Sequence, residues 1–260
     1  MSGIELKFVE PRALGFIECK LPQEFIDYLW ERIEASKEKD FKSNLAGNIS
    51  ESYALEDKDN FFFSRVAWKV QQAYIKKFGD IYASRRYTFG MLKDAMGSFW
   101  WNRQKKHEFN PYHHHNGTYS FVIFLKIPTK WEDQKDLPFL QGIKLKDRRA
   151  SNFEFEYTNG FGEIVNYAYQ LSPEFEGTML FFPAGLRHTV YPYYDNDESR
   201  VTVSGNLVQV PVTDSEEINS VQQHWASQDK NFLPPKLHPD PPTVLYQTPA
   251  TQDLGTRTGK

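Results

Sequence analysis

The stretch YHHHNGTYSFVIFLKIP, residues 112–128, joins three consecutive histidines to a run of aromatic and β-branched residues. Residues 119–127 have the composition of a buried strand, and Pro128 marks its end. Similar strand patterns recur downstream, at residues 153–157, 164–171, 178–182, 188–192 and 200–210. Short strands separated by turn-forming sequences such as Asn-Gly predict an antiparallel sandwich or barrel.

Two segments before these strands have the apolar spacing of amphipathic helices. The first covers residues 21–36, and the second covers residues 60–78 and stops at Gly79. A short third helix is predicted after the strands, at residues 215–225. Together the patterns predict a mainly β fold with flanking α-helices packed on it.

We expect a single domain over residues 1–230, followed by a tail. The domain would comprise a helical N-terminal part (about 1–90), a β-rich core (about 91–212) and the short helix (214–226). Residues 231–260 are rich in proline, which favours an extended chain on the surface.

Composition excludes several classes of protein. The 31 basic residues nearly balance the 34 acidic ones, so nucleic acid is not an expected partner. No apolar run is long enough to cross a membrane, and charges interrupt the N-terminus where an export signal would be apolar. Cys19 is the only cysteine, so neither an internal disulfide nor a cysteine-based zinc site can form. We therefore expect a soluble, cytoplasmic protein without a membrane partner; its oligomeric state is not indicated.

The histidine triplet has two interpretations. Along a strand, His113 and His115 project to one side and His114 to the other, which makes a two-point metal ligand. His188, at the start of a later strand, is the best candidate for the third ligand, ahead of His107, His224 and His238. The alternative is that the triplet lies in a solvated loop and binds nothing.

Arg200 begins a strand that also carries Thr202 and Ser204 on the same face. If residues 188–192 and 200–204 pair as a hairpin, Arg200 lies about 13 Å from His188, at about 3.3 Å per residue. That distance suits a small dicarboxylate held between a metal and a guanidinium group. The alternative for Arg200 is a surface ion pair with Asp197 or Glu198.

In this order, the motifs resemble those of the iron(II)- and 2-oxoglutarate-dependent oxygenases, and most closely a branch with Trp-x-Asn ahead of His-x-His. The matching positions, within about residues 98–208, are Trp100, Asn102, His113, His115, Ser120, the segment 177–183 (GTMLFFP), His188 and Arg200. The resemblance implies a double-stranded β-helix, or jelly roll, over the core. It also implies iron(II) on His113, His115 and His188, and 2-oxoglutarate on Arg200 with Asn102, Thr202 or Ser204.

The same resemblance implies that the protein is a dioxygenase, and that the reaction it catalyses is a hydroxylation. Such an enzyme converts 2-oxoglutarate and O2 into succinate and carbon dioxide while it oxidises a substrate C–H bond. The substrate would be a small molecule or a peptide side chain. Of the nearby aromatic residues, Trp101 and Tyr191 are the candidates for contacting it, although packing in the core is the alternative for both.

Two positions depart from the family pattern. His115 stands where related proteins generally have Asp or Glu, so the site is one charge unit more positive. Ile123 and Phe124 stand where tyrosines often occur, and neither can donate a hydrogen bond to the co-substrate. Because His115 fills the carboxylate position, a halide-binding variant is not favoured.

Two other functions agree with the same residues. One is a three-histidine metal dioxygenase that does not use 2-oxoglutarate, and the other is a non-catalytic jelly-roll binding or structural module. The charged segment 129–150 is expected to be a solvated insertion, with a lid over the site as the alternative.

Overall fold

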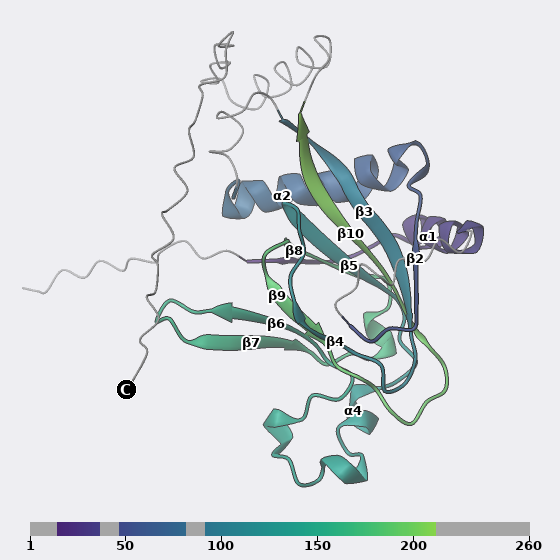
Figure 1. Ribbon diagram of the computed structural model, residues 1–260, viewed down its shortest axis with the longest axis vertical. Helices are drawn as coiled ribbons and strands as arrows, with labels where there is room; N and C mark the ends of the chain where they lie inside the picture. Colours follow the sequence, from purple (N-terminus) through teal and green to yellow (C-terminus); the bar gives the residue numbers. More distant parts are fainter. Residues whose placement is uncertain (1–14, 37–46, 82–91, 212–260) are drawn as a thin grey trace, which may run out of the picture.

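The computed structural model describes residues 15–36, 47–81 and 92–211, and its strands form two antiparallel sheets (Figure 1). The major sheet has the order β1-β8-β5-β10-β3-β2, and the minor sheet has the order β4-β9-β6-β7. The major-sheet strands are β1 (Ile17–Lys20), β2 (Glu51–Ala54), β3 (Leu92–Gln104), β5 (Tyr119–Lys126), β8 (Thr178–Pro183) and β10 (Arg200–Pro211). The minor-sheet strands are β4 (Asn110–His113), β6 (Phe153–Thr158), β7 (Ile164–Tyr169) and β9 (Arg187–Val190). This double-stranded β-helix arrangement confirms the predicted mainly β fold.

Helices cover the outer face of the major sheet, and both predicted segments are confirmed. They are α1 (Gln23–Ala35) and α2 (Trp68–Phe78). A π-helical turn, η3 (Phe63–Ala67), leads into α2, so the second segment is not one uniform helix. Gly79 ends α2 with a φ of 88°, and its N–H donates to the Ile75 carbonyl at 2.8 Å.

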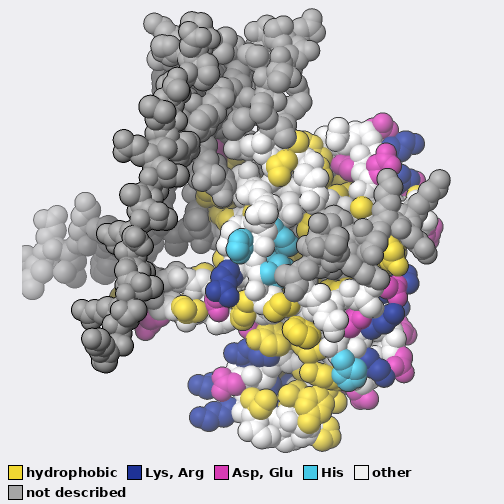
Figure 2. Space-filling view, viewed as in Figure 1, with side chains coloured by type: hydrophobic (Ala, Val, Ile, Leu, Met, Phe, Trp, Pro, Cys, Tyr) yellow, Lys and Arg dark blue, Asp and Glu magenta, His cyan; other side chains and the backbone are white. Residues whose placement is uncertain are grey.

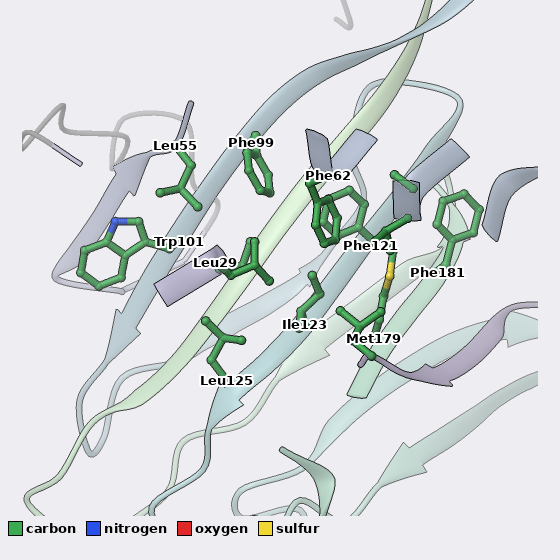
Figure 3. Close-up of a cluster of buried hydrophobic side chains, with 14 of the residues drawn as sticks. Leu29, Leu55, Phe62, Phe99, Trp101, Phe121, Ile123, Leu125, Met179 and Phe181 are labelled. Carbon is green, nitrogen blue, oxygen red and sulfur yellow. The ribbon is translucent and has the colours of Figure 1, made fainter. Parts of the chain in front are cut away.

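Alternation along the major-sheet strands divides the apolar residues between two cores. Side chains such as Phe121 and Ile123 of β5 face the helices, where they pack with Phe62 and Leu29 (Figure 3). Val122 and Phe124 point the other way, into the space between the two sheets. The candidate site lies on this inner face.

Several elements had no clear sequence signal. The edge strands β1 and β2 come from the N-terminal part that was expected to be helical. The strand pattern of residues 153–157 also gives no sign that Glu154 is fully buried, where it pairs with Arg149 at 2.7 Å. The predicted helix at 215–225 and the tail from residue 231 lie outside the described residues.

The segment between β5 and β6 is compact and projects beyond the minor sheet (Figure 1). It contains α4 (Trp131–Gln134) and the short turns η4 (Pro138–Leu140) and η5 (Leu145–Asp147). Arg148 stabilises this segment by donating a hydrogen bond to the Lys135 carbonyl at 2.7 Å. Two further single turns are η2 (Lys58–Asn60) and η6 (Pro173–Phe175). Within the described residues, no helix has both the length and the apolar character that a membrane span requires.

Candidate metal centre

Three histidines from two strands and a loop meet on the inner side of the fold. His113 ends β4 and pairs directly with His188 of β9 in the minor sheet. His115 follows in the connection to β5, where its N–H donates to the Ala184 carbonyl at 2.9 Å. One nitrogen from each ring lies within 4.8 Å of the others. Histidine side chains are visible near the middle of one face of the molecule (Figure 2).

Hydrogen bonds fix the orientation of two of these rings. Nδ1 of His113 lies 2.7 Å from the Pro111 carbonyl, and Nδ1 of His188 lies 3.0 Å from the Leu186 carbonyl. A carbonyl oxygen only accepts, so each Nδ1 carries the proton and each Nε2 keeps a free lone pair. Hydrogen bonds of this kind, from the ring nitrogen that does not face the metal, orient metal-binding histidines.

Burial keeps the three rings uncharged. It lowers the pKa of His113, and it lowers the pKa of His188 far below its usual range. For His115, burial and then the neighbouring His113 and His114 lower the pKa to about 4. Neutral imidazole is the form that binds a metal, so the cluster fits a divalent cation with three nitrogen ligands.

A narrow cavity adjoins the histidines on the inner face of the major sheet. Its polar wall contains Asn102 of β3 with Thr202 and Ser204 of β10, and its apolar wall contains Phe124 and Phe182. Its free volume is about 40 Å³, which corresponds to about three water molecules at roughly 10–15 Å³ each. Among the described residues that line it, none has a charged side chain.

Arg200 lies beyond Thr202, opposite Gln104 at one end of this polar wall, and is only 1% exposed. Its guanidinium donates to Gln104 Oε1 at 3.2 Å and to Ser151 Oγ at 2.7 Å. It also lies over the Tyr193 ring, at 5.2 Å from the ring centroid. Burial lowers the pKa of Arg200 to about 10. Arg200 itself does not line the cavity, but its partner Gln104 does.

Two arrangements considered for Arg200 do not occur among the described residues. It is not in a surface ion pair, because Asp197 pairs with Lys106 and Glu198 pairs with Lys126. It is not in a hairpin with the His188 strand either, because β9 and β10 belong to different sheets. The distance of about 13 Å expected between Arg200 and His188 assumed that hairpin and does not apply. Both residues nevertheless face the space between the sheets.

Two predicted substrate contacts, Trp101 and Tyr191, do not line the cavity, and neither does Ile123. Trp101 faces the helix-covered core (Figure 3). Its neighbour Trp100 lines the cavity. Ile123 likewise belongs to that core, whereas Val122 and Phe124 of β5 line the cavity. Tyr191 follows β9, and its side chain interacts with that of Tyr112.

The remaining predicted positions fall as follows. Asn102, Thr202 and Ser204 line the cavity, and Gln104 joins them from the same face of β3. Gln104 was missed, although the alternation that brings Trp100 and Asn102 to one face also includes it. His114 is exposed, as expected from its position between the two ligands. His107 packs against Tyr194 instead of the cluster, and His224 and His238 lie outside the described residues.

A family comparison agrees with this geometry. Residues 98–206 match the family described as "Putative 2OG-Fe(II) oxygenase", a span that contains all three histidines and Arg200. The segment that carries the candidate site is therefore similar to the 2-oxoglutarate- and iron(II)-dependent oxygenases. The family is one of oxidoreductases, and its members use iron(II) and 2-oxoglutarate.

Solved structures show weaker similarity. A Pseudomonas putida prolyl-4-hydroxylase is 11% identical, with 74% of this chain and 90% of that chain covered and a TM-score of 0.39. A Burkholderia pseudomallei oxidoreductase of the 2OG-Fe(II) oxygenase family is 15% identical, with 76% and 86% covered and a TM-score of 0.37. The Escherichia coli ribosomal oxygenase YcfD is 12% identical, with 74% and 43% covered and a TM-score of 0.25. No curated protein matches the sequence. At these scores the assignment rests on the family match and the histidine cluster.

Proposed function

We propose that this protein is a 2-oxoglutarate-dependent hydroxylase with iron(II) held by His113, His115 and His188. The observation that carries the proposal is the combination on one inner face of a neutral three-imidazole cluster and a buried guanidinium. The imidazole cluster can bind a divalent metal ion, and the guanidinium can bind a carboxylate of a small dicarboxylate.

Iron(II), when bound, would supply the redox chemistry that couples decarboxylation of 2-oxoglutarate to oxidation of a substrate C–H bond. The protein supplies position and electrostatics. The carbonyl groups of Pro111 and Leu186 hold two ligand rings in the required tautomer. Phe124 and Phe182 give the cavity an apolar wall that limits the entry of water.

The end of the cavity beside Gln104 fits the distal carboxylate of 2-oxoglutarate. Among the described residues, Arg200 has no carboxylate partner and its Nε has no hydrogen bond. A buried cation without a counter-ion is costly, and an entering anion would offset that cost. Asn102 Oδ1 is likewise buried without a partner, and Thr202 offers a hydroxyl beside it.

Binding there requires a local rearrangement. Gln104 lies between Arg200 and the cavity, and both ends of its amide are already used, because Nε2 donates to the Glu108 carbonyl at 2.6 Å. The co-substrate would therefore displace cavity water and contact Arg200 either beside or in place of Gln104. Arg200 and Thr202 belong to the same strand face, so one carboxylate can contact both.

Hydroxylation is favoured over halogenation because His115 supplies a third protein ligand where a halide would otherwise bind. A three-histidine dioxygenase that does not use 2-oxoglutarate is the second candidate. The observation that favours it is the all-imidazole ligand set, together with the absence of Arg200 from the lining of the cavity.

Turnover separates the two candidates. The protein is reconstituted with iron(II) under anaerobic conditions, mixed with 2-oxoglutarate and exposed to air, and succinate is measured. We expect succinate that depends on iron and is lost in His188→Ala. Bound iron with no succinate would overturn the proposal and favour the second candidate, and a protein that binds no iron would leave the binding-module alternative.

A further inference from the structure

The polar wall of the cavity continues past the histidines. On the inner face of the major sheet, the β3 and β10 side chains stand opposite each other in pairs, such as Asn102 with Thr202 and Trp100 with Ser204. Beyond Trp100, the row continues with Ser98 on β3 and Asn206 on β10. Asn206 is held on this face because Ser120 of β5 donates to its Oδ1 at 2.8 Å.

These outer residues line a second, larger hollow. Its walls include Ser98, Trp100, His114, His115, Asn116 and Asn206, and its volume is about 530 Å³. The inner cavity has about 40 Å³ on the same measure, so the hollow alone reaches the size of a typical small-molecule site, roughly 300–1,000 Å³. Trp100 and His115 line both spaces, and their rings lie 5.6 Å apart between centroids. A ligand in the hollow would therefore lie directly beside the metal ligand His115.

The loop that forms the floor of the hollow is fixed in place. The N–H of Thr118 donates to the Leu207 carbonyl at 2.8 Å, and the N–H of Ala184 donates to the Thr118 carbonyl at 3.1 Å. Gly117 has a φ of +133°, and a Cβ there would lie 2.7 Å from the Leu207 carbonyl oxygen. The loop therefore holds Asn116 and His115 in one arrangement, as a binding site requires.

The chemistry of the hollow points to an uncharged ligand. The described residues that line it offer a hydroxyl, two amides and imidazole groups, but no carboxylate, ammonium or guanidinium. Because Oδ1 of Asn206 already accepts from Ser120, its NH2 group is the part left to donate to a ligand carbonyl. Arg200, the one buried arginine or lysine in the described part of the chain, lies six residues back along β10, about 20 Å away at roughly 3.3 Å per residue.

We propose that the outer hollow is the binding site for the primary substrate, and that it recognises an uncharged amide group such as a peptide or carboxamide unit. The role as substrate site rests on the function proposed above, whereas the preference for an uncharged amide does not. The inner cavity then holds the co-substrate, and His115 lies between the two. Amide donors and acceptors on the hollow wall match those of a peptide group.

The test uses two probes that differ only in charge: N-acetyl-alanyl-alaninamide and its free acid, N-acetyl-alanyl-alanine. Binding to the metal-free full chain is measured by saturation-transfer NMR, and proximity to the histidines is measured by the relaxation that bound cobalt(II) causes in each probe. The variants are Asn206→Ala and the exposed Asn116→Ala, and the matched control is Asn166→Ala on β7. Two substitutions are used because Asn206→Ala also removes the bond to Ser120.

We expect the amide to bind more tightly than the acid by at least about tenfold, and to be relaxed by cobalt(II). Either substitution in the hollow should weaken amide binding about fivefold or more, and Asn166→Ala should not change it. Equal or tighter binding of the acid, no binding of either probe, or amide binding unchanged in both hollow variants would overturn the proposal. Selective amide binding in a protein that makes no succinate would retain the ligand class while overturning the proposed reaction.

Discussion

His188 is the residue on which the metal centre depends most, because it is only 4% exposed and pairs with His113 across the minor sheet. His188→Ala should abolish stoichiometric binding of iron(II) or cobalt(II). We expect metal affinity to fall by more than the roughly 10–100-fold that follows removal of a residue that only hydrogen-bonds a ligand. Metal content after gel filtration measures this, with the exposed His114→Ala as the matched control. Full metal content in His188→Ala would show that another side chain is the third ligand.

Arg200 is the residue that separates a 2-oxoglutarate enzyme from other metal dioxygenases. Arg200→Met keeps much of the side-chain volume and removes the charge. We expect it to weaken 2-oxoglutarate binding by about 2–5 kcal/mol, the cost of breaking a buried charge pair. An anaerobic titration of the iron(II) protein, followed by the visible charge-transfer band, measures this. Unchanged affinity, with iron still bound, would place the carboxylate elsewhere.

The neutral histidines also predict how the metal-free protein responds to pH. Burial lowers the pKa of each ring in the folded state, and that of His115 falls to about 4. Unfolded histidine titrates near pH 6.5. Below that pH the unfolded chain binds protons that the folded chain does not bind. The free energy of unfolding should therefore fall as the pH is lowered from about 6.5 to 4. Melting temperatures across this range measure the effect, and a His115→Gln variant should show a shallower fall. An identical slope in both proteins would contradict the prediction.

At the scale of elements, the loop after His115 depends on one backbone conformation. Gly117→Ala would place a Cβ 2.7 Å from the Leu207 carbonyl oxygen at a φ of +133°. We expect it to destabilise the fold by about 1–3 kcal/mol and to weaken metal binding through His115. Chemical unfolding and metal content measure the two effects. Gly142→Ala is the matched control, since nothing lies within 4 Å of a Cβ there. Equal stability of the two variants would show that the loop is not constrained in this way.

Local sequence patterns predicted the helices and strands well, but they did not predict which strands pair with one another. The apolar spacing of residues 21–36 and the β-branched run of residues 119–127 identify α1 and β5, because each pattern depends only on neighbours in sequence. The hairpin between β9 and β10 was wrong, because strand pairing is decided by contacts far apart in the chain. Trp101 was misplaced for a simpler reason: residues in β3 alternate between the core and the cavity, and only its register shows which of the two tryptophans faces the site.

At the scale of the whole molecule, a bound metal would join β4, β9 and the loop that leads into the major sheet. Binding to the folded state alone adds about 2.7 kcal/mol of stability when the free metal is at 100 times its Kd. Cobalt(II) should therefore raise the melting temperature, a chelator should reverse the rise, and His188→Ala should show none. A rise of the same size in His188→Ala would show that the stabilising ion binds elsewhere.

The most direct test of the account is a crystal structure of the protein with cobalt(II) and 2-oxoglutarate bound. We expect one metal ion on Nε2 of His113 and His188 and on a ring nitrogen of His115, and the distal carboxylate of 2-oxoglutarate in contact with Arg200 and Thr202. The outer hollow beside Trp100 and Asn206 should remain open for the substrate. A metal ion bound away from the three histidines, or 2-oxoglutarate lying in the outer hollow with Arg200 still held by Gln104, would contradict it.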